Sequence, residues 1–336
     1  MQTGKRLWAL MCCMLMIFLP TAQAAQPLES GTPMTLTTPS AILAETATGT
    51  VIFEKNADER VPIASITKVM TLLLTFEAIH NGQLTLETTV PVSEHAYHMG
   101  GSQIWLKEGE QMRVEDLIKA VCVVSGNDAA VALGEHLAGS EEAFVARMNE
   151  RAKELGMNDT HFVNCTGLPA DGHVTSAYDI ALMSRELIWR HPDIRRFTTI
   201  WMDSLRGGAS MLVNTNKLVR FYPGATGLKT GSTDSAKYCI SATAEKDGME
   251  LIAVILGGST SDKRFSDAKA LLNYGFAAYS LVTVTPESPL PAVPVTLGTQ
   301  KTVQSVLTSE NALLLEKSRA NGLTQAVSLP ESIDAV

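Results

Sequence analysis

Three short groups of polar residues could together build a catalytic site around a nucleophilic serine. Ser65–Lys68 has the pattern Ser-x-x-Lys, Ser125–Asn127 has Ser-x-Asn, and Lys229–Gly231 is Lys-Thr-Gly. Single patterns are weak signals, because a Ser-x-x-Lys arises about once by chance in a chain of this length. Ser266–Lys269 and Ser309–Asn311 indeed repeat the first two patterns. Because only the first set is followed by the other two in order, its serine is the candidate nucleophile.

Ser65 and Lys68 have the spacing that a serine nucleophile and its base require. The apolar periodicity after Pro62 predicts a helix over 65–80, which places residues i and i+3 on one face. The positive end of the helix dipole and partial burial both disfavour the ammonium form of Lys68. A neutral Lys68 can take the proton of Ser65. The alternative, a helix-capping serine with a surface lysine, is the commoner meaning of an isolated motif.

The second motif lies between two predicted helices, where Gly126 would allow a tight loop. In such a loop Ser125 could pass a proton between Lys68 and a leaving amine. Asn127 could form hydrogen bonds with the substrate backbone and with the lysine. A purely structural alternative is that Asn127 or Asp128 caps the next helix, and a cap is compatible with a catalytic role.

The third motif falls on a predicted edge strand. Lys229 and Thr230 suit the binding of a terminal carboxylate, and Gly231 would leave room for a substrate lying alongside as an extra strand. The backbone amides of Ser65 and Ser232 are the candidates for an oxyanion hole, in which one donor is worth about 3 kcal/mol. The alternative is an ordinary sheet edge whose charge deters aggregation.

The elements that would position these groups predict an α+β fold, an antiparallel β-sheet flanked by helices. A β-hairpin begins the fold, a helical region follows, and three strands and a helix end the catalytic part. Short β-like segments come after a Pro-rich stretch and predict a small β domain. The predicted strands are 41–45, 50–54, 226–230, 238–244, 250–256, 293–297, 303–306 and 312–316, and the predicted helices are 65–80, 114–124, 128–138, 141–155, 177–189 and 262–279.

Residues 1–24 have the pattern of a secretory signal peptide. Lys5 and Arg6 precede an apolar run over 7–19, and Ala-Gln-Ala over 22–24 supplies a cleavage site. The alternative is an uncleaved anchor, but the run is shorter than the roughly 20 residues of a spanning helix. We therefore expect export to the periplasm or to the outer face of the cytoplasmic membrane or cell wall. Cleavage changes the formal charge from −8 to −10, which argues against nucleic acid as a partner.

The cysteines and histidines point to no other chemistry. Cys122, Cys165 and Cys239 remain after cleavage, so at least one thiol is free, and their apolar surroundings predict buried free cysteines. Only His95 and His98 lie close together, without a metal-binding His-Glu-x-x-His pattern, so we expect loop or surface residues. No metal and no cofactor is predicted.

At these motifs the chain resembles the serine-type D-alanyl-D-alanine carboxypeptidases, which are low-molecular-mass penicillin-binding proteins, over about residues 35–280. The resemblance implies a penicillin-binding/β-lactamase-like transpeptidase fold. It also implies that Ser65 attacks the penultimate D-alanine carbonyl of a peptidoglycan stem peptide, D-alanine leaves, and water hydrolyses the acyl-enzyme. β-Lactam antibiotics would be covalent inhibitors. The segments that carry the resemblance are 64–70, 125–130, 164–168 and 222–231.

The same resemblance implies further features. It places Arg264 near the substrate carboxylate, and the chain has Thr226 where the family usually has an acidic residue. From the predicted elements we expect a catalytic domain over 37–280, a Pro-rich linker over 281–292 and a β domain over 293–336, which the resemblance implies is partial and apparently incomplete. Relatives continue with further strands and often an amphipathic membrane anchor, which is not present in this chain, so we expect a fragment or a truncated chain.

Three other functions share part or all of this pattern. A DD-transpeptidase, which passes the acyl group to an amine instead of water, shares every motif. A penicillin-binding sensor would be acylated without turnover, but the sequence has no transmembrane signalling segment. A class A β-lactamase needs a glutamate that activates water. Glu154 has a suggestive spacing to Asn158, but Gly156 instead indicates that Glu154 ends a helix.

Overall fold

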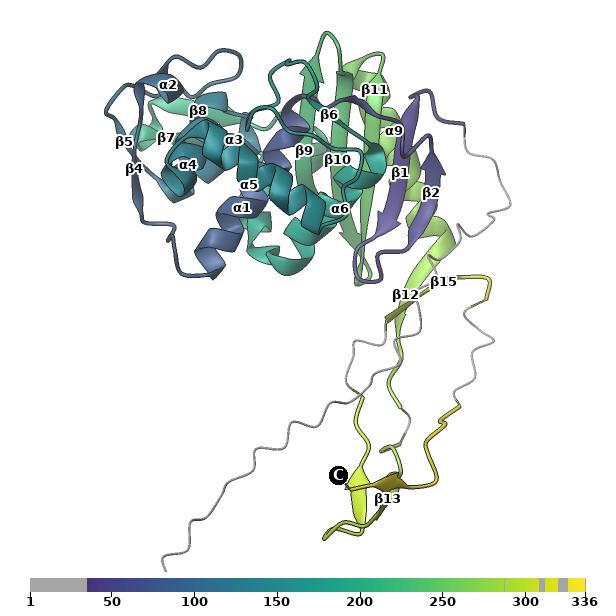
Figure 1. Ribbon diagram of the computed structural model, residues 1–336. Helices are drawn as coiled ribbons and strands as arrows, with labels where there is room; N and C mark the ends of the chain where they lie inside the picture. The colour runs from purple at the N-terminus through teal and green to yellow at the C-terminus, as the bar shows by residue number, and fades with distance from the viewer. Residues whose placement is uncertain (1–34, 287, 308–311, 320–325, 336) are drawn as a thin grey trace, which may run out of the picture.

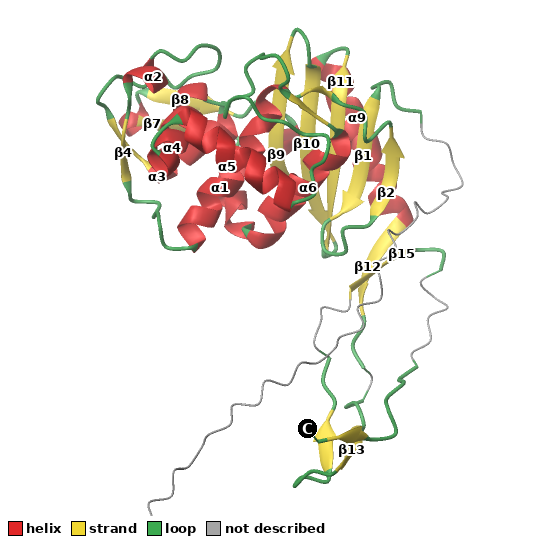
Figure 2. Cartoon of the chain, in the orientation of Figure 1, coloured by secondary structure: helices red, strands yellow, loops and turns green. Residues whose placement is uncertain are grey.

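The computed structural model describes residues 35–286, 288–307, 312–319 and 326–335, so the predicted signal peptide lies outside the described residues. Its main body is a five-stranded antiparallel sheet with helices on both faces, which confirms the predicted α+β fold (Figures 1 and 2). The strand order is β2-β1-β11-β10-β9. These strands are β1 Ser40–Glu45, β2 Val51–Lys55, β9 Ala225–Thr233, β10 Lys237–Lys246 and β11 Met249–Gly258.

The sheet is buried on both faces because the side chains of its central strands alternate between two hydrophobic cores. In β11, Ile252 and Val254 pack into the core on the helical side. Their neighbours Leu251 and Ala253 pack into a second core with helix α9 (Ser261–Ala278). A strand covered on both faces needs apolar residues at consecutive positions, and this explains the continuous apolar sequence of β11.

The helical layer on the other face contains the five helices that the sequence predicted between residues 65 and 189. Helix α1 is buried along most of its length, including Val69, Met70 and Phe76, and it packs against α6. The predicted bounds agree with the observed ones to within three residues. These helices are α1 Lys68–His80, α3 Val114–Val123, α4 Asn127–Ala138, α5 Glu141–Glu154 and α6 Ala177–Arg190.

Several short elements were not predicted, because two to four residues carry too little periodicity to be recognised. They form three antiparallel pairs of short strands. They also include several short helical turns. The strand pairs are β3 Val61–Pro62 with β6 Val174–Thr175, β4 Thr89–Pro91 with β5 Gln111–Arg113, and β7 Met202–Leu205 with β8 Ser210–Val213. The turns are α2 Glu94–Tyr97, η2 Pro192–Ile194, α7 Arg195–Thr198, η3 Arg206–Gly208 and α8 Leu218–Phe221.

The C-terminal strands extend away from the main body (Figure 1). Strand β12 (Tyr279–Thr283) pairs with β15 (Ala312–Glu316), and β13 (Ala292–Thr296) pairs with β14 (Thr302–Gln304) and with β16 (Ile333–Asp334). The strands predicted here are present, whereas the domain boundaries stay a prediction. None of the helices in the described ranges is long and apolar enough to cross a membrane.

Candidate active site

The candidate nucleophile lies on a tight turn immediately before helix α1. Ser65 belongs to the 3₁₀ turn η1 (Ala64–Thr67), and Lys68 is the first residue of α1. Ala64 adopts a left-handed φ of 56°, which is strained for a residue with a Cβ. The predicted helix start is thus a 3₁₀ turn, but it still puts the serine and lysine side chains together, with 3.0 Å between Lys68 Nζ and Ser65 Oγ.

The Lys68 ammonium or amine is fully buried and has three oxygen neighbours. Nζ lies 3.0 Å from Ser65 Oγ, 2.6 Å from Asn127 Oδ1 and 2.5 Å from the Thr166 carbonyl oxygen. Burial, and then the charge of Lys229, holds the pKa of Lys68 well below its usual value. A neutral amine has two N–H donors and one lone pair. Since the amide and carbonyl oxygens can only accept, they take both hydrogens and leave the lone pair for the Ser65 hydroxyl.

The Ser-x-Asn motif lies in the loop that leads into α4. The strained residue of this loop is Ser125, with a left-handed φ of 64°. Gly126 has φ −54°, a backbone conformation that any residue can adopt. Ser125 Oγ is buried without a hydrogen-bond partner among the described residues. Asn127 donates its backbone N–H to Ser102 O at 2.7 Å and its Nδ2 to Gly100 O at 2.6 Å. The latter bond directs Asn127 Oδ1 toward the lysine of the first motif.

The Lys-Thr-Gly motif lies on β9, which is an edge strand as predicted. Lys229 is nonetheless buried, and its Nζ donates to Thr230 O at 2.9 Å. Burial lowers the pKa of Lys229 to about 7, and the charge of Arg264 acts in the same direction. Thr230 Oγ1 lies 2.7 Å from Thr215 Oγ1. Of the two side chains expected to bind a carboxylate, the lysine therefore titrates near neutral pH.

Gly231 permits the strand to approach the nucleophile turn. A Cβ at this position would lie 2.9 Å from the backbone nitrogen of Ser65 and 3.1 Å from that of Ile66, so any larger residue would separate the two segments. The close approach of the two segments therefore requires glycine at position 231, in addition to the space for the substrate that the sequence predicts. It also places Ser232, the next residue and an exposed one, on the segment beside the Ser65 backbone amide.

Arg264 lies behind the same strand, on α9. Its Nη1 donates to Gly231 O and to Cys239 O, both at 3.2 Å, and the guanidinium lies 4.5 Å from the ring centroid of Phe265. Burial lowers the pKa of Arg264 to about 10. The arginine thus contacts the backbone of the motif that it was expected to assist, and its charge lies close to Lys229.

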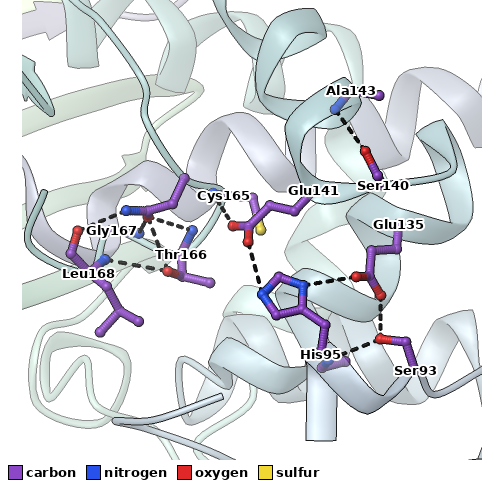
Figure 3. Close-up of polar contacts among 12 residues, drawn as sticks. Ser93, His95, Glu135, Ser140, Glu141, Ala143, Cys165, Thr166, Gly167 and Leu168 are labelled. Carbon is purple, nitrogen blue, oxygen red and sulfur yellow. Dashed lines mark hydrogen bonds and ion pairs between the residues drawn. The ribbon is translucent and has the colours of Figure 1, made fainter. Parts of the chain in front are cut away.

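The loop 164–168 is part of the site and carries a group to which the sequence assigned no role. Thr166 O accepts from the buried lysine. Asn164 Oδ1 accepts from the backbone N–H groups of Thr166 at 3.2 Å and Gly167 at 2.7 Å. Figure 3 shows Cys165, Thr166, Gly167 and Leu168 of this loop. Gly167 has φ 86°, and a Cβ there would lie 1.9 Å from Ala64 O. The turn-forming Asn-x-x-Gly spacing is the signal that could have indicated this loop.

An open hollow lies between this loop, the nucleophile turn and the end of β9. Its volume is about 390 Å³. His173 forms part of its wall, and its Nε2 lies 2.7 Å from Thr67 Oγ1. Burial lowers the pKa of His173 to about 4, so this ring is neutral at physiological pH. Ala64, the residue before the candidate nucleophile, lines this hollow, which therefore adjoins the nucleophile turn. Its other walls include Pro62, Ala64, Leu168, Thr233 and Ser235.

The competing sequence patterns lie elsewhere. Ser266 is exposed on α9, and Ser309–Asn311 lies outside the described residues. Glu154 is exposed near the end of α5 and pairs with Arg151 at 3.1 Å, in line with its interpretation as a helix-end residue. No group of three potential metal ligands occurs in the described part of the chain.

Cys122, Cys165 and Cys239 are buried free thiols. Burial raises the pKa of Cys122 to about 12 and that of Cys239 to about 11, and it raises the pKa of Cys165 well above its usual value. Thiols with such pKa values stay protonated and are poor nucleophiles. The predicted absence of cysteine chemistry therefore has a physical basis at all three positions.

Comparisons with known proteins show which family the chain belongs to. The family profile described as D-alanyl-D-alanine carboxypeptidase, peptidase S11, matches residues 23–260. The chain is 41% identical over 327 residues to D-alanyl-D-alanine carboxypeptidase DacF of Bacillus subtilis, covering 96% of this chain and 84% of the relative. Penicillin-binding protein 5 from Haemophilus influenzae has a similar structure, with a TM-score of 0.82, 27% identity and coverage of 91% and 90%.

A further solved structure is penicillin-binding protein D2 from Listeria monocytogenes in its ampicillin-bound form. It is 35% identical, with a TM-score of 0.67, and the match covers 73% of this chain and 100% of that one. Sequence and structure thus lead to the same group of proteins, over the region that contains all three motifs. The chain belongs to the D-alanyl-D-alanine carboxypeptidase family.

Proposed function

We propose that this chain is an exported serine D-alanyl-D-alanine carboxypeptidase that removes the terminal D-alanine from peptidoglycan stem pentapeptides. The observation that carries the proposal is the buried Lys68, whose two hydrogens face acceptor oxygens while Ser65 Oγ lies 3.0 Å away. A depressed pKa makes the neutral amine available as a base. Membership of the carboxypeptidase family supports the choice of substrate.

Acylation proceeds as a proton-coupled attack by the serine. Ser65 Oγ forms a bond to the carbonyl carbon of the penultimate D-alanine while Lys68 takes the hydroxyl proton. The tetrahedral oxyanion accepts hydrogen bonds from the backbone N–H groups of Ser65 and Ser232, which lie on adjoining segments. Ser125, whose Oγ is buried and available, passes the proton to the leaving nitrogen, and the C–N bond breaks to release D-alanine.

The substrate is oriented by its terminal carboxylate. Lys229 supplies a cation, Thr230 supplies a hydroxyl, and Arg264 fixes the Gly231 carbonyl and adds positive charge behind the strand. Water then attacks the ester carbonyl while Lys68 takes one of its protons. The ester bond breaks, Ser65 regains a proton, and the shortened peptide leaves.

β-Lactams would follow the first half of this reaction. The ampicillin-bound form of the Listeria relative supports penicillin as a ligand of this site. Opening of the β-lactam ring leaves the amine attached to the acyl group, so no D-alanine-like product departs. We therefore expect a penicilloyl ester on Ser65 that hydrolyses slowly.

The decisive experiment is release of free D-alanine from a diacyl-Lys-D-Ala-D-Ala peptide, with Ser65→Ala as the control. Steady release by the native protein, and neither release nor penicillin labelling by the variant, is the expected result. Stable penicillin labelling without release would instead indicate a sensor or a strict transpeptidase. A Ser65→Ala protein that is still labelled would refute the assigned nucleophile.

A further inference from the structure

A chain of polar contacts links Glu135, His95 and Glu141 to Cys165 in the loop 164–168 (Figure 3). Glu141, the first residue of α5, accepts a hydrogen bond through Oε1 from the backbone N–H of Cys165 at 2.9 Å. Its Oε2 lies 3.4 Å from Nε2 of His95, which is on α2. The other ring nitrogen, Nδ1, lies 2.9 Å from Glu135 Oε1 on α4. One histidine thus connects two glutamates from two helices.

The residue held by Glu141 is fixed at both of its backbone polar groups. Cys165 N–H donates to Glu141, and Cys165 O accepts from Thr71 Oγ1 of α1 at 2.8 Å. The next carbonyl along the chain is Thr166 O, which accepts from Lys68 Nζ. Fixing both groups of Cys165 restricts the backbone rotations that could move the Thr166 carbonyl away from the lysine.

The contacts are sheltered, and no described group in them touches the reacting atoms. The exposed fractions of the side chains are 13% for Glu141 and 18% for Glu135, whereas His95 is half exposed at 49%. Ser93 Oγ, at the N-cap of α2, donates to Glu135 Oε2 at 2.5 Å and so ties α2 to α4. Glu141 Oε1 accepts the Cys165 N–H, and Oε2 faces the His95 ring at 3.4 Å, so the two contacts together favour one rotation of the carboxylate.

We propose that Glu141, oriented by His95, is a positioning residue for the acylation step. It holds Cys165 so that the Thr166 carbonyl accepts one hydrogen of Lys68 and the amine lone pair faces Ser65. This inference rests on the proposed function, because it concerns the base of that same reaction. Its failure would leave the roles of Ser65 and Lys68 unchanged.

The test compares Glu141→Leu and Glu141→Gln in the full chain, with Glu142→Leu as the matched control. Glu142 is the next residue of the same first helical turn and is fully exposed, so its loss removes a similar interaction with the helix dipole. The measurement is stopped-flow acylation by a fluorescent penicillin. It separates the non-covalent dissociation constant from the saturating acylation rate.

We expect Glu141→Leu to lower the saturating rate by about 10- to 100-fold, the loss typical of a misplaced catalytic group, with the dissociation constant changed less than about twofold. Glu141→Gln keeps an acceptor for Cys165 N–H and should restore the rate to within about threefold of the native value. Glu142→Leu should have the native rate. Circular dichroism and the thermal midpoint verify that each variant is folded.

His95→Gln provides a second route to the same conclusion, also if Glu141→Leu does not fold. It should lower the saturating rate about two- to fivefold, and it should add little to Glu141→Leu, because both act on one contact. A native rate in both Glu141→Leu and His95→Gln would overturn the inference. So would an equal loss in Glu142→Leu, or a change confined to the dissociation constant. A native protein that penicillin does not acylate would instead refute the proposed function.

Discussion

Two sides of the active site each carry one buried lysine, and the two lysines are arranged differently. On the helical side, Lys68 Nζ has three oxygen neighbours within 3.0 Å. On the sheet side, Lys229 Nζ forms one hydrogen bond within the described residues, to Thr230 O. Burial is the main cause of the lowered pKa in both. Burial alone therefore does not distinguish the proposed base, Lys68, from the proposed anion-binding group, Lys229.

The two lysines differ in which hydrogens or lone pairs of Nζ are left free by the neighbouring oxygens. The acceptors around Lys68 occupy its hydrogens, so the group can contribute only a lone pair. Lys229 retains donors for a ligand, and its positive charge also lowers the pKa of Lys68. A protonated Lys229 thus favours the neutral form of the base, and the two lysines support one another in opposite protonation states.

The most severe change to this pair is Lys68→Gln. Glutamine can form hydrogen bonds with Asn127 and Thr166 but cannot take a proton from Ser65. We expect the acylation rate to fall by about 10²- to 10⁴-fold, the usual contribution of a general base. Stopped-flow labelling by penicillin measures it. A rate within tenfold of the native one would mean that another group is the base.

The corresponding change on the sheet side is Lys229→Ala. A charge-assisted hydrogen bond is worth about 1.5–3 kcal/mol, so kcat/KM for a peptide with a free C-terminal carboxylate should fall about 10- to 100-fold. A peptide amidated at its C-terminus should lose much less. Parallel assays of the two peptides measure the difference, and equal losses would remove the assigned role of Lys229.

The pH dependence should separate the two lysines without mutation. Lys229 has a pKa of about 7 and is a cation only below it, so kcat/KM for the free-carboxylate peptide should decline as the pH rises through about 7. The amidated peptide should lack this decline. On the acid side, both peptides should lose activity together as Lys68 becomes protonated. An identical alkaline limb for the two peptides would contradict this assignment.

The smallest effect is expected at the competing Ser-x-x-Lys pattern. Ser266 is exposed on α9, so Ser266→Ala should keep the native rate of D-alanine release and of penicillin labelling. Its comparison with Ser65→Ala tests the choice between two identical spacings. Loss of activity in the Ser266 variant would show that the wrong serine was selected.

The sequence predicted those features that leave a pattern of side-chain types along the chain. Apolar periodicity predicted α1, and the strands predicted over 238–244 and 250–256 are observed as β10 and β11. The Thr166 carbonyl had no such signal, because a backbone oxygen carries no side-chain identity. The left-handed backbone of Ser125 was not predicted either, because the tight loop was expected at the neighbouring Gly126. The contact of the Thr166 carbonyl with Lys68 joins segments that are 98 residues apart in the chain.

Thr226 illustrates the same limit. This position differs from the acidic residue usual in the family, and the sequence offers no substitute nearby. In the structure, Thr226 Oγ1 donates to Glu250 Oε1 of β11 at 2.8 Å, and Glu250 also pairs with Arg195. A carboxylate therefore does lie beside this part of β9, but it comes from another strand of the sheet. The pairing of the strands brings Glu250 beside Thr226, and the sequence alone did not predict this pairing.

The burial of Lys229 also makes folding a proton-linked equilibrium. In an unfolded chain this lysine titrates near 10.5, whereas in the folded protein it titrates near 7. Between these values the unfolded chain binds more protons, so the free energy of unfolding rises with pH over that window. Below about pH 7 the folded state carries the full cost of a buried cation. The group proposed to recognise the substrate thus weakens the fold at neutral pH and below, and a bound carboxylate would offset that loss.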